Sequence, residues 1–97
     1  MKVFFSPQFS ERVLKYEFNN DVVTVTLNGV TEVFDFTGMP NGVADSIESE
    51  AFNFNPVISA KKENNILYLK LINFIGVDAT EEERFPEWVE VKSDGKD

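Results

Sequence analysis

Hydrophobic and polar residues alternate along the first half of this chain with the period of two that β-strands require. In the segment 12–18, Leu14, Tyr16 and Phe18 share one face. The segment 22–27 alternates in the same way, and the turn-forming sequence Asn-Asn-Asp separates the two runs. The pattern therefore predicts two adjacent β-strands.

A tight turn is predicted at Asn28-Gly29, directly before a third alternating run at 30–36. Asn-Gly between alternating segments is a strong hairpin signal, because a type I′ turn needs a positive φ at both central residues. The first half of the chain therefore predicts an antiparallel meander.

Three further segments favour extended structure. An aromatic and β-branched run occupies 2–6 and is expected to end at Pro7. Residues 57–62 and 66–74 form a second predicted hairpin around Glu-Asn-Asn. The 66–74 segment is apolar on both faces, which is typical of a central strand covered on each side. We therefore expect a closed barrel or two packed sheets.

The connection at 37–56 breaks this rhythm with two glycines, two prolines and a second Asn-Gly. Val43, Ile47 and Ala51 recur with helical spacing, so a helical turn or two is predicted within it. The aromatic stretch at 52–55 is predicted as a short extended piece.

A short helical turn is predicted directly after Thr80. Thr80 followed three residues later by Glu83 matches the capping box, in which each residue binds the backbone N–H of the other. Phe85 precedes Pro86, which disfavours helix and ends the turn. Residues 88–91 then return to an extended pattern.

Together these elements predict a mainly β fold. We expect a small antiparallel barrel or sandwich of about six or seven strands, with one short helical turn near the C-terminus. Ninety-seven residues suit a single domain. We place that domain at 1–92 and treat 93–97 as a polar C-terminal tail.

The chain is strongly acidic, with a formal net charge of −8. Residues 1–77 carry nine acids and six bases, whereas residues 78–97 carry eight acids and three bases. A negative field repels nucleic-acid phosphates and anionic lipids, so we expect neither a nucleic acid nor a membrane as a partner. A protein partner is expected instead.

Little in the sequence favours catalysis. The chain has no cysteine and no histidine, which removes thiolate nucleophiles, Ser-His-Asp machinery and the commonest metal ligand. Adjacent helical residues point in different directions, so Glu81, Glu82 and Glu83 are not expected to share a metal ion. We predict a protein that is not an enzyme, with no catalytic, cofactor-binding or metal-binding residues and no cofactor.

The segment 78–88 is the best candidate for a contact with a partner, because it combines acids with the only tryptophan. Aromatic residues surrounded by charge are common in binding hot spots. The competing interpretation is that Phe85 and Trp88 close one end of the core. The candidate contact residues are Glu81, Glu82, Phe85, Glu87 and Trp88.

Three stretches of the chain carry a resemblance: FFSPQFSERVLKYEF, DFTGMPNG and LINFIGVDATEEERFPEW. Together they resemble small uncharacterised proteins encoded in the tail-gene regions of phages and prophages of low-GC Gram-positive bacteria. The resemblance covers most of the chain, and DATEEERFPEW is its most specific part. The segment EAFNFNP is more aromatic than the group leads us to expect. The resemblance implies a phage origin and a tail-associated role, and it supplies no catalytic residues.

Two functional hypotheses follow. The first is a phage- or prophage-encoded structural or accessory protein that binds tail components or itself, in the host cytoplasm or in the virion. The second is an acidic inhibitor of a host nucleic-acid-binding protein that imitates the charge of DNA. The identity of the bound partner separates the two.

Overall fold

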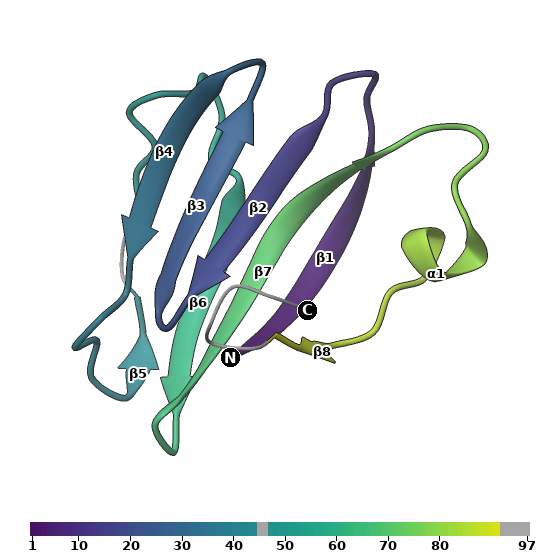
Figure 1. The fold of residues 1–97 in the computed structure, drawn as a ribbon. Helices are drawn as coiled ribbons and strands as arrows, with labels where there is room; N and C mark the ends of the chain where they lie inside the picture. Colours follow the sequence, from purple (N-terminus) through teal and green to yellow (C-terminus); the bar gives the residue numbers. More distant parts are fainter. Residues whose placement is uncertain (45–46, 92–97) are drawn as a thin grey trace.

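The computed structural model describes residues 1–44 and 47–91. These residues form eight strands in two sheets and one short helix near the C-terminus (Figure 1). The prediction of a mainly β fold is therefore confirmed. The sheets are not closed into a barrel. The predicted tail at 93–97 and the last residue of the predicted domain lie outside the described residues.

The larger sheet has five strands in the order β5-β6-β7-β1-β8. Their bounds are β5 (Gly42–Val43), β6 (Val57–Glu63), β7 (Ile66–Ile75), β1 (Lys2–Phe9) and β8 (Val89–Glu90). The smaller sheet is a meander of β2 (Leu14–Asn19), β3 (Val22–Leu27) and β4 (Val30–Asp35). Helix α1 (Glu81–Arg84) lies between β7 and β8 in the chain.

The meander follows the predicted pattern closely. Asn28 and Gly29 have φ angles of 52° and 81°, so both central residues of the turn adopt the positive φ that a hairpin of this kind needs. Along β3, Val23, Val25 and Leu27 are buried. The predicted turn and the predicted inward face of this hairpin are both confirmed.

Strand β7 occupies the centre of the five-stranded sheet, between β6 and β1. Its residues Leu67, Leu69 and Leu71 are at most 1% exposed. They belong to one core cluster with Val23 and Val25 of the meander, so the two sheets share a single core. The central position predicted for this strand is confirmed. The prediction that it is covered on both sides was wrong, because the meander covers only its inner face and Lys70 on the outer face is exposed.

Strand β1 runs parallel to β7 along its whole length, from Lys2 beside Tyr68 to Phe9 beside Ile75. The other pairings among the described strands are antiparallel. The sequence predicted a mainly antiparallel fold, and this parallel pair is the exception among the described strands. Parallel strands need a long connection, and here that connection includes the whole meander (Figure 1).

Strand β1 also continues through Pro7, where the sequence analysis wrongly placed its end. Strand β8 pairs only with the first two residues of β1, so β1 is open on that side at Pro7. Ser10 donates its backbone N–H to Ile75 of β7. The backbone N–H groups of successive strand residues point to alternate edges of the strand. Since the Ser10 N–H points to β7, the nitrogen of Pro7, three residues earlier, points to the open edge. The missing N–H of Pro7 therefore costs no hydrogen bond between strands.

The connection between β4 and β6 contains no helical turn within its described parts, 37–44 and 47–56. The helix predicted from the spacing of Val43, Ile47 and Ala51 was therefore wrong. Val43 pairs with β6 in the short strand β5, and Ala51 lies in a bend.

A carboxylate of β4 explains why this connection stays irregular. Glu32 accepts hydrogen bonds from the Ser49 hydroxyl at 2.6 Å and from the backbone N–H groups of Glu50 and Ala51 at 2.8 and 3.4 Å. Those N–H groups are thus bound to β4 instead of to a helix. The predicted extended piece at 52–55 is a series of bends.

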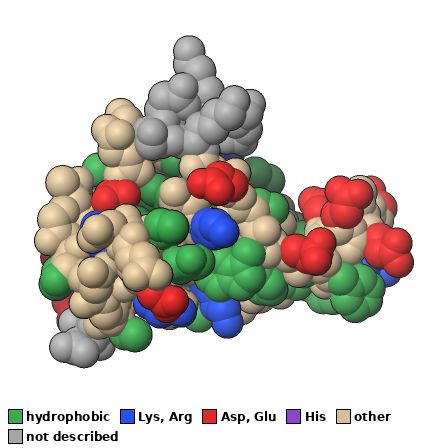
Figure 2. Space-filling model, turned by 90° about the horizontal axis from the view of Figure 1, so that it is seen from below, with side chains coloured by type: hydrophobic (Ala, Val, Ile, Leu, Met, Phe, Trp, Pro, Cys, Tyr) green, Lys and Arg blue, Asp and Glu red, His purple; other side chains and the backbone are tan. Residues whose placement is uncertain are grey.

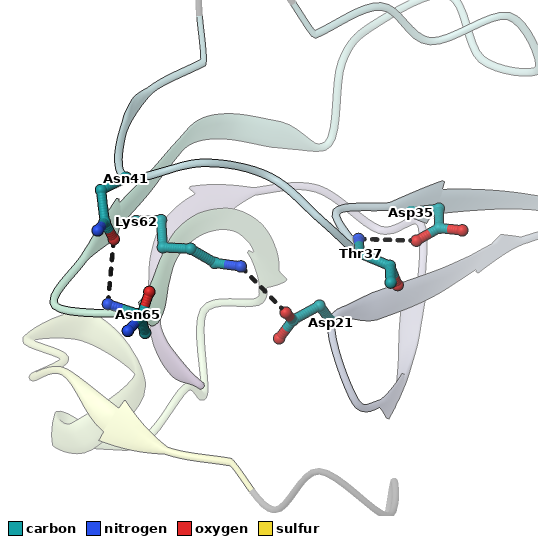
Figure 3. A network of polar contacts seen from close by, with 6 residues as sticks. All are labelled: Asp21, Asp35, Thr37, Asn41, Lys62 and Asn65. Carbon is teal, nitrogen blue, oxygen red and sulfur yellow. Dashed lines mark hydrogen bonds and ion pairs between the residues drawn. The ribbon is translucent and has the colours of Figure 1, made fainter.

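Two polar contacts fix the end of the molecule that Figure 3 shows. The Lys62 Nζ of β6 lies 3.3 Å from the Asp21 Oδ2 in the turn between β2 and β3, so this ion pair joins the two sheets. Asn65 donates its backbone N–H to the Asn41 Oδ1 at 3.0 Å, which holds the β6–β7 turn against the connection before β5.

A candidate protein-binding surface

Helix α1 begins directly after its N-cap, Thr80, as predicted. The Glu83 N–H donates to the Thr80 hydroxyl at 3.2 Å, and the Thr80 N–H donates to the Glu83 carboxylate at 2.9 Å. The predicted capping box is therefore confirmed. The Arg84 guanidinium also donates to the backbone carbonyl of Val77 at 2.7 Å. These hydrogen bonds all join residues within 77–84, so none of them involves a residue of the core.

Residues 78–87, which we call the acidic lobe, carry five acids and one base. The acids are all exposed: Asp78, Glu81, Glu82, Glu83 and Glu87. No residue of α1 is buried. Figure 1 places α1 outside the sheets, beyond β1, and Figure 2 shows red side chains gathered on the protrusion at the right. The negative charge is thus concentrated on a projection of the molecule.

The structure separates the two aromatic residues that the sequence analysis grouped together. Phe85 is 74% exposed on the lobe. Trp88 is 44% exposed, and its ring centroid lies 5.7 Å from those of both Phe4 and Tyr68. Trp88 therefore covers part of the five-stranded sheet, whereas Phe85 covers none of the core.

A shallow groove of about 520 Å³ separates the lobe from the body. Phe5 and Val89 line its body side. Of the five predicted contact residues, Glu82, Phe85 and Glu87 also line the groove. The other two, Glu81 and Trp88, do not line it, so the structure brings together three members of the predicted set.

A second surface lies on the outer face of the five-stranded sheet, away from the meander. Register places Lys2 beside Tyr68 and Phe4 beside Lys70, and these positions alternate with core residues that face inward. In β6, Lys61 pairs with Tyr68 and so lies on the same face. We call this surface the aromatic–lysine face, made of Lys2, Phe4, Lys61, Tyr68, Lys70 and Trp88.

Lysine side chains lie over the aromatic rings of this face. The Lys61 Nζ is 5.3 Å from the centroid of the Tyr68 ring, and the Lys70 Nζ is 5.7 Å from that of Phe4. Both distances are typical of cation–π contacts. The sequence predicted the 66–74 segment to be apolar on both faces. The pattern along the chain gave no sign of this surface, because the pairing of β1 with β7 creates it.

Tyr16 donates its hydroxyl proton to the backbone carbonyl of Ile72, and burial raises the pKa of this tyrosine. Within residues 1–44 and 47–91, no three acidic side chains lie close enough together to hold a metal ion. No helix in this part of the chain is long and apolar enough to cross a membrane.

Comparison with protein-family models, curated proteins and solved structures gave no match to this chain. The interpretation of both surfaces therefore rests on their geometry and charge.

Proposed function

We propose that this chain is a phage- or prophage-encoded structural or accessory protein, associated with the tail, that acts by binding another protein and not by catalysis. The observation that supports the proposal is the acidic lobe, on which Phe85 is 74% exposed among five acids. The most specific part of the resemblance, DATEEERFPEW, spans this lobe. The phage and tail assignment rests on that resemblance.

The chemistry of the lobe suggests what its partner offers. An aromatic side chain that is exposed in the free protein gains apolar burial when a pocket receives it. The acids around Phe85 favour a basic rim around that pocket and accelerate the encounter. We therefore expect a partner surface with an apolar pocket bordered by lysine or arginine.

Binding to the purified products of the neighbouring tail genes tests the proposal. We expect wild-type protein to bind one of them and Phe85→Ala to bind roughly tenfold or more weakly. Phe9→Ala is the matched control, because Phe9 is also an exposed phenylalanine, 73% accessible, and lies outside the lobe. Failure to bind any tail product, together with absence from purified particles, would contradict the proposal.

The acidic-inhibitor hypothesis remains the second candidate, because the lobe gathers five acids on one projection. A complex with a host nucleic-acid-binding protein that weakens with salt, and that duplex DNA displaces, would favour it over the tail-associated role. Replacing Glu81 and Glu82 by glutamine would then weaken the complex more than Phe85→Ala does.

A further inference from the structure

The two surfaces of this molecule carry opposite charge. The acidic lobe presents one exposed aromatic ring, Phe85, surrounded by carboxylates. The aromatic–lysine face presents three aromatic rings with ammonium groups beside them. The carboxylates of the lobe can therefore pair with the ammonium groups of the face, and the Phe85 ring can pack on its aromatic rings.

We propose that the aromatic–lysine face is a docking site for the acidic lobe of a second copy of this chain. The inference deepens the proposed function, since it rests on the lobe being a protein-binding element and names one of its partners. Every copy carries one lobe and one face. Two copies can therefore satisfy both contacts in a symmetric dimer, or several copies can associate head to tail.

The lobe cannot reach the face of its own chain. It borders a groove whose body side includes Phe5 and Val89. Phe5 follows Phe4 in the chain, and Val89 follows Trp88. Because side chains alternate along a strand, Phe5 and Val89 point to the side of the sheet opposite the aromatic–lysine face. Trp88 connects the lobe directly to the face, so the chain between them is too short to fold over the sheet edge. Another copy must supply the lobe.

Lys70 is the residue on which the docking site depends most. Lys61 already forms an ion pair with Glu63 at 3.4 Å, and Glu90 lies opposite Lys2 in the register. Lys70 belongs to no ion pair among the described residues. Its ammonium group, held beside the Phe4 ring, can therefore receive a carboxylate without breaking an existing pair.

Charge argues for a protein segment over a nucleic acid as the occupant. Single-stranded nucleic acids bind to aromatic platforms that carry a continuous basic groove. This face has three lysines and two nearby acids in a chain whose net charge is −8, so a long polyanion meets repulsion from the rest of the molecule. At physiological salt, charges beyond about 8 Å are largely screened. A short lobe therefore interacts mainly with the lysines of the face, whereas a long polyanion also passes close to acids elsewhere on the surface.

Self-association tests this inference directly. Sedimentation velocity over a concentration series reaching high micromolar, at physiological salt, should show association of the wild-type protein. Fluorescence of Trp88, the only tryptophan, should change over the same range because the residue lies in the docking face. We expect Lys70→Glu to weaken association roughly tenfold or more, and Lys15→Glu to weaken it far less. Both lysines are exposed, and the two changes alter the net charge equally.

Reversing the charge of the lobe provides a second test, with a matched control outside both surfaces. Replacing Glu81 and Glu82 by lysine should abolish association, whereas replacing Glu11 and Glu17 by lysine should preserve it. All four glutamates are exposed, and Glu11 and Glu17 lie outside both surfaces. Mixing the Lys70→Glu protein with the lobe-reversed protein should restore association, because an acidic face then meets a basic lobe.

The outcomes separate this inference from the proposed function. A monomer at every concentration, equal behaviour of Lys70→Glu and Lys15→Glu, or a Trp88 signal that responds to a single-stranded oligonucleotide and not to protein concentration would each overturn the docking site. Binding to a tail product that depends on Phe85 could still be observed in those cases. Self-association without binding to any tail product would instead overturn only the proposed function.

Discussion

The two faces of the five-stranded sheet are built from the same strands and behave in opposite ways. On the inner face, Val3 and Leu69 are completely buried. One residue further along each strand, Phe4 and Lys70 lie on the outer face, where Phe4 is half-buried and Lys70 is exposed. Because the side-chain period of a strand is two, a single strand can hold the core together and present a recognition surface.

The two faces should differ in how well they tolerate substitutions. The residues of the inner face pack the two sheets together. Because protein interiors are close-packed, few other side chains would fit at these positions. The outer face contributes little to the core, so its residues are free to serve a partner. Variants on the two faces measure how complete that division is.

Truncation of the inner face should be the most damaging change. Leu69→Ala removes a completely buried side chain at the centre of the core, so we expect it to lower the free energy of unfolding by about 2–5 kcal/mol. Lys70→Ala, the next residue, should change it by no more than about 0.5 kcal/mol. Urea unfolding followed by circular dichroism measures the free energy of unfolding of both variants. Equal losses would show that the two faces contribute equally to stability.

Trp88→Ala tests whether the outer face also stabilises the fold. The ring is roughly half covered by Phe4 and Tyr68, so we expect a loss of about 1–2 kcal/mol, less than for a fully buried tryptophan. Phe85→Ala should cost almost nothing, because Phe85 covers none of the core. A loss as large as that of Leu69→Ala would show that Trp88 is a core residue.

Glu32→Gln probes the loop that β4 holds in place. Burial raises the pKa of Glu32, but hydrogen bonds from Ser49, Glu50 and Ala51 outweigh it and lower the pKa below its ordinary value of 4.5. We expect the variant to be less stable by about 1 kcal/mol at neutral pH.

The pH dependence of that difference has a defined sign. A carboxylate with a lowered pKa in the folded state contributes stability above its ordinary pKa, and that contribution disappears as the pH falls through the folded-state value. The stability gap between the wild-type protein and Glu32→Gln should therefore narrow below about pH 4.5. Thermal unfolding at a series of pH values measures the gap, and a gap that widens in acid would contradict the assignment.

Thr80→Ala should have the smallest global effect. It removes the capping box of α1, which is worth about 0.5–2 kcal/mol to a helix end. Since no residue of α1 is buried, we expect the loss to stay within the lobe and the global unfolding midpoint to remain unchanged. Faster amide hydrogen exchange at Glu83 and Arg84 would reveal it. A shift of the global midpoint would show that the lobe is coupled to the core.

What could be predicted from the sequence was local. The turn at Asn28-Gly29 and the cap at Thr80 depend on residues a few positions apart, so both could be inferred from the pattern alone. The alternation of β3 likewise revealed its buried face, because the meander packs one side of each strand against the other sheet.

The remaining features depend on which segments meet across the fold. Whether Pro7 interrupts a strand depends on which side of that strand is open, and the strand order decides this. The aromatic–lysine face likewise arises from a long-range pairing that brings Phe4 beside Lys70. Its individual residues showed no pattern along the chain, because they come from four separate segments: β1, β6, β7 and the residue before β8.

The parallel pairing of β1 with β7 has a consequence for the order of folding. The meander joins neighbouring segments through tight turns, so it can form soon after residue 35 leaves the ribosome. Strand β1 is synthesised first but has no partner until β7 follows, and closing that long loop carries an entropic cost. We expect the nascent chain to expose an unpaired, aromatic β1 until β7 has been synthesised, and a chaperone would have its greatest effect during that interval.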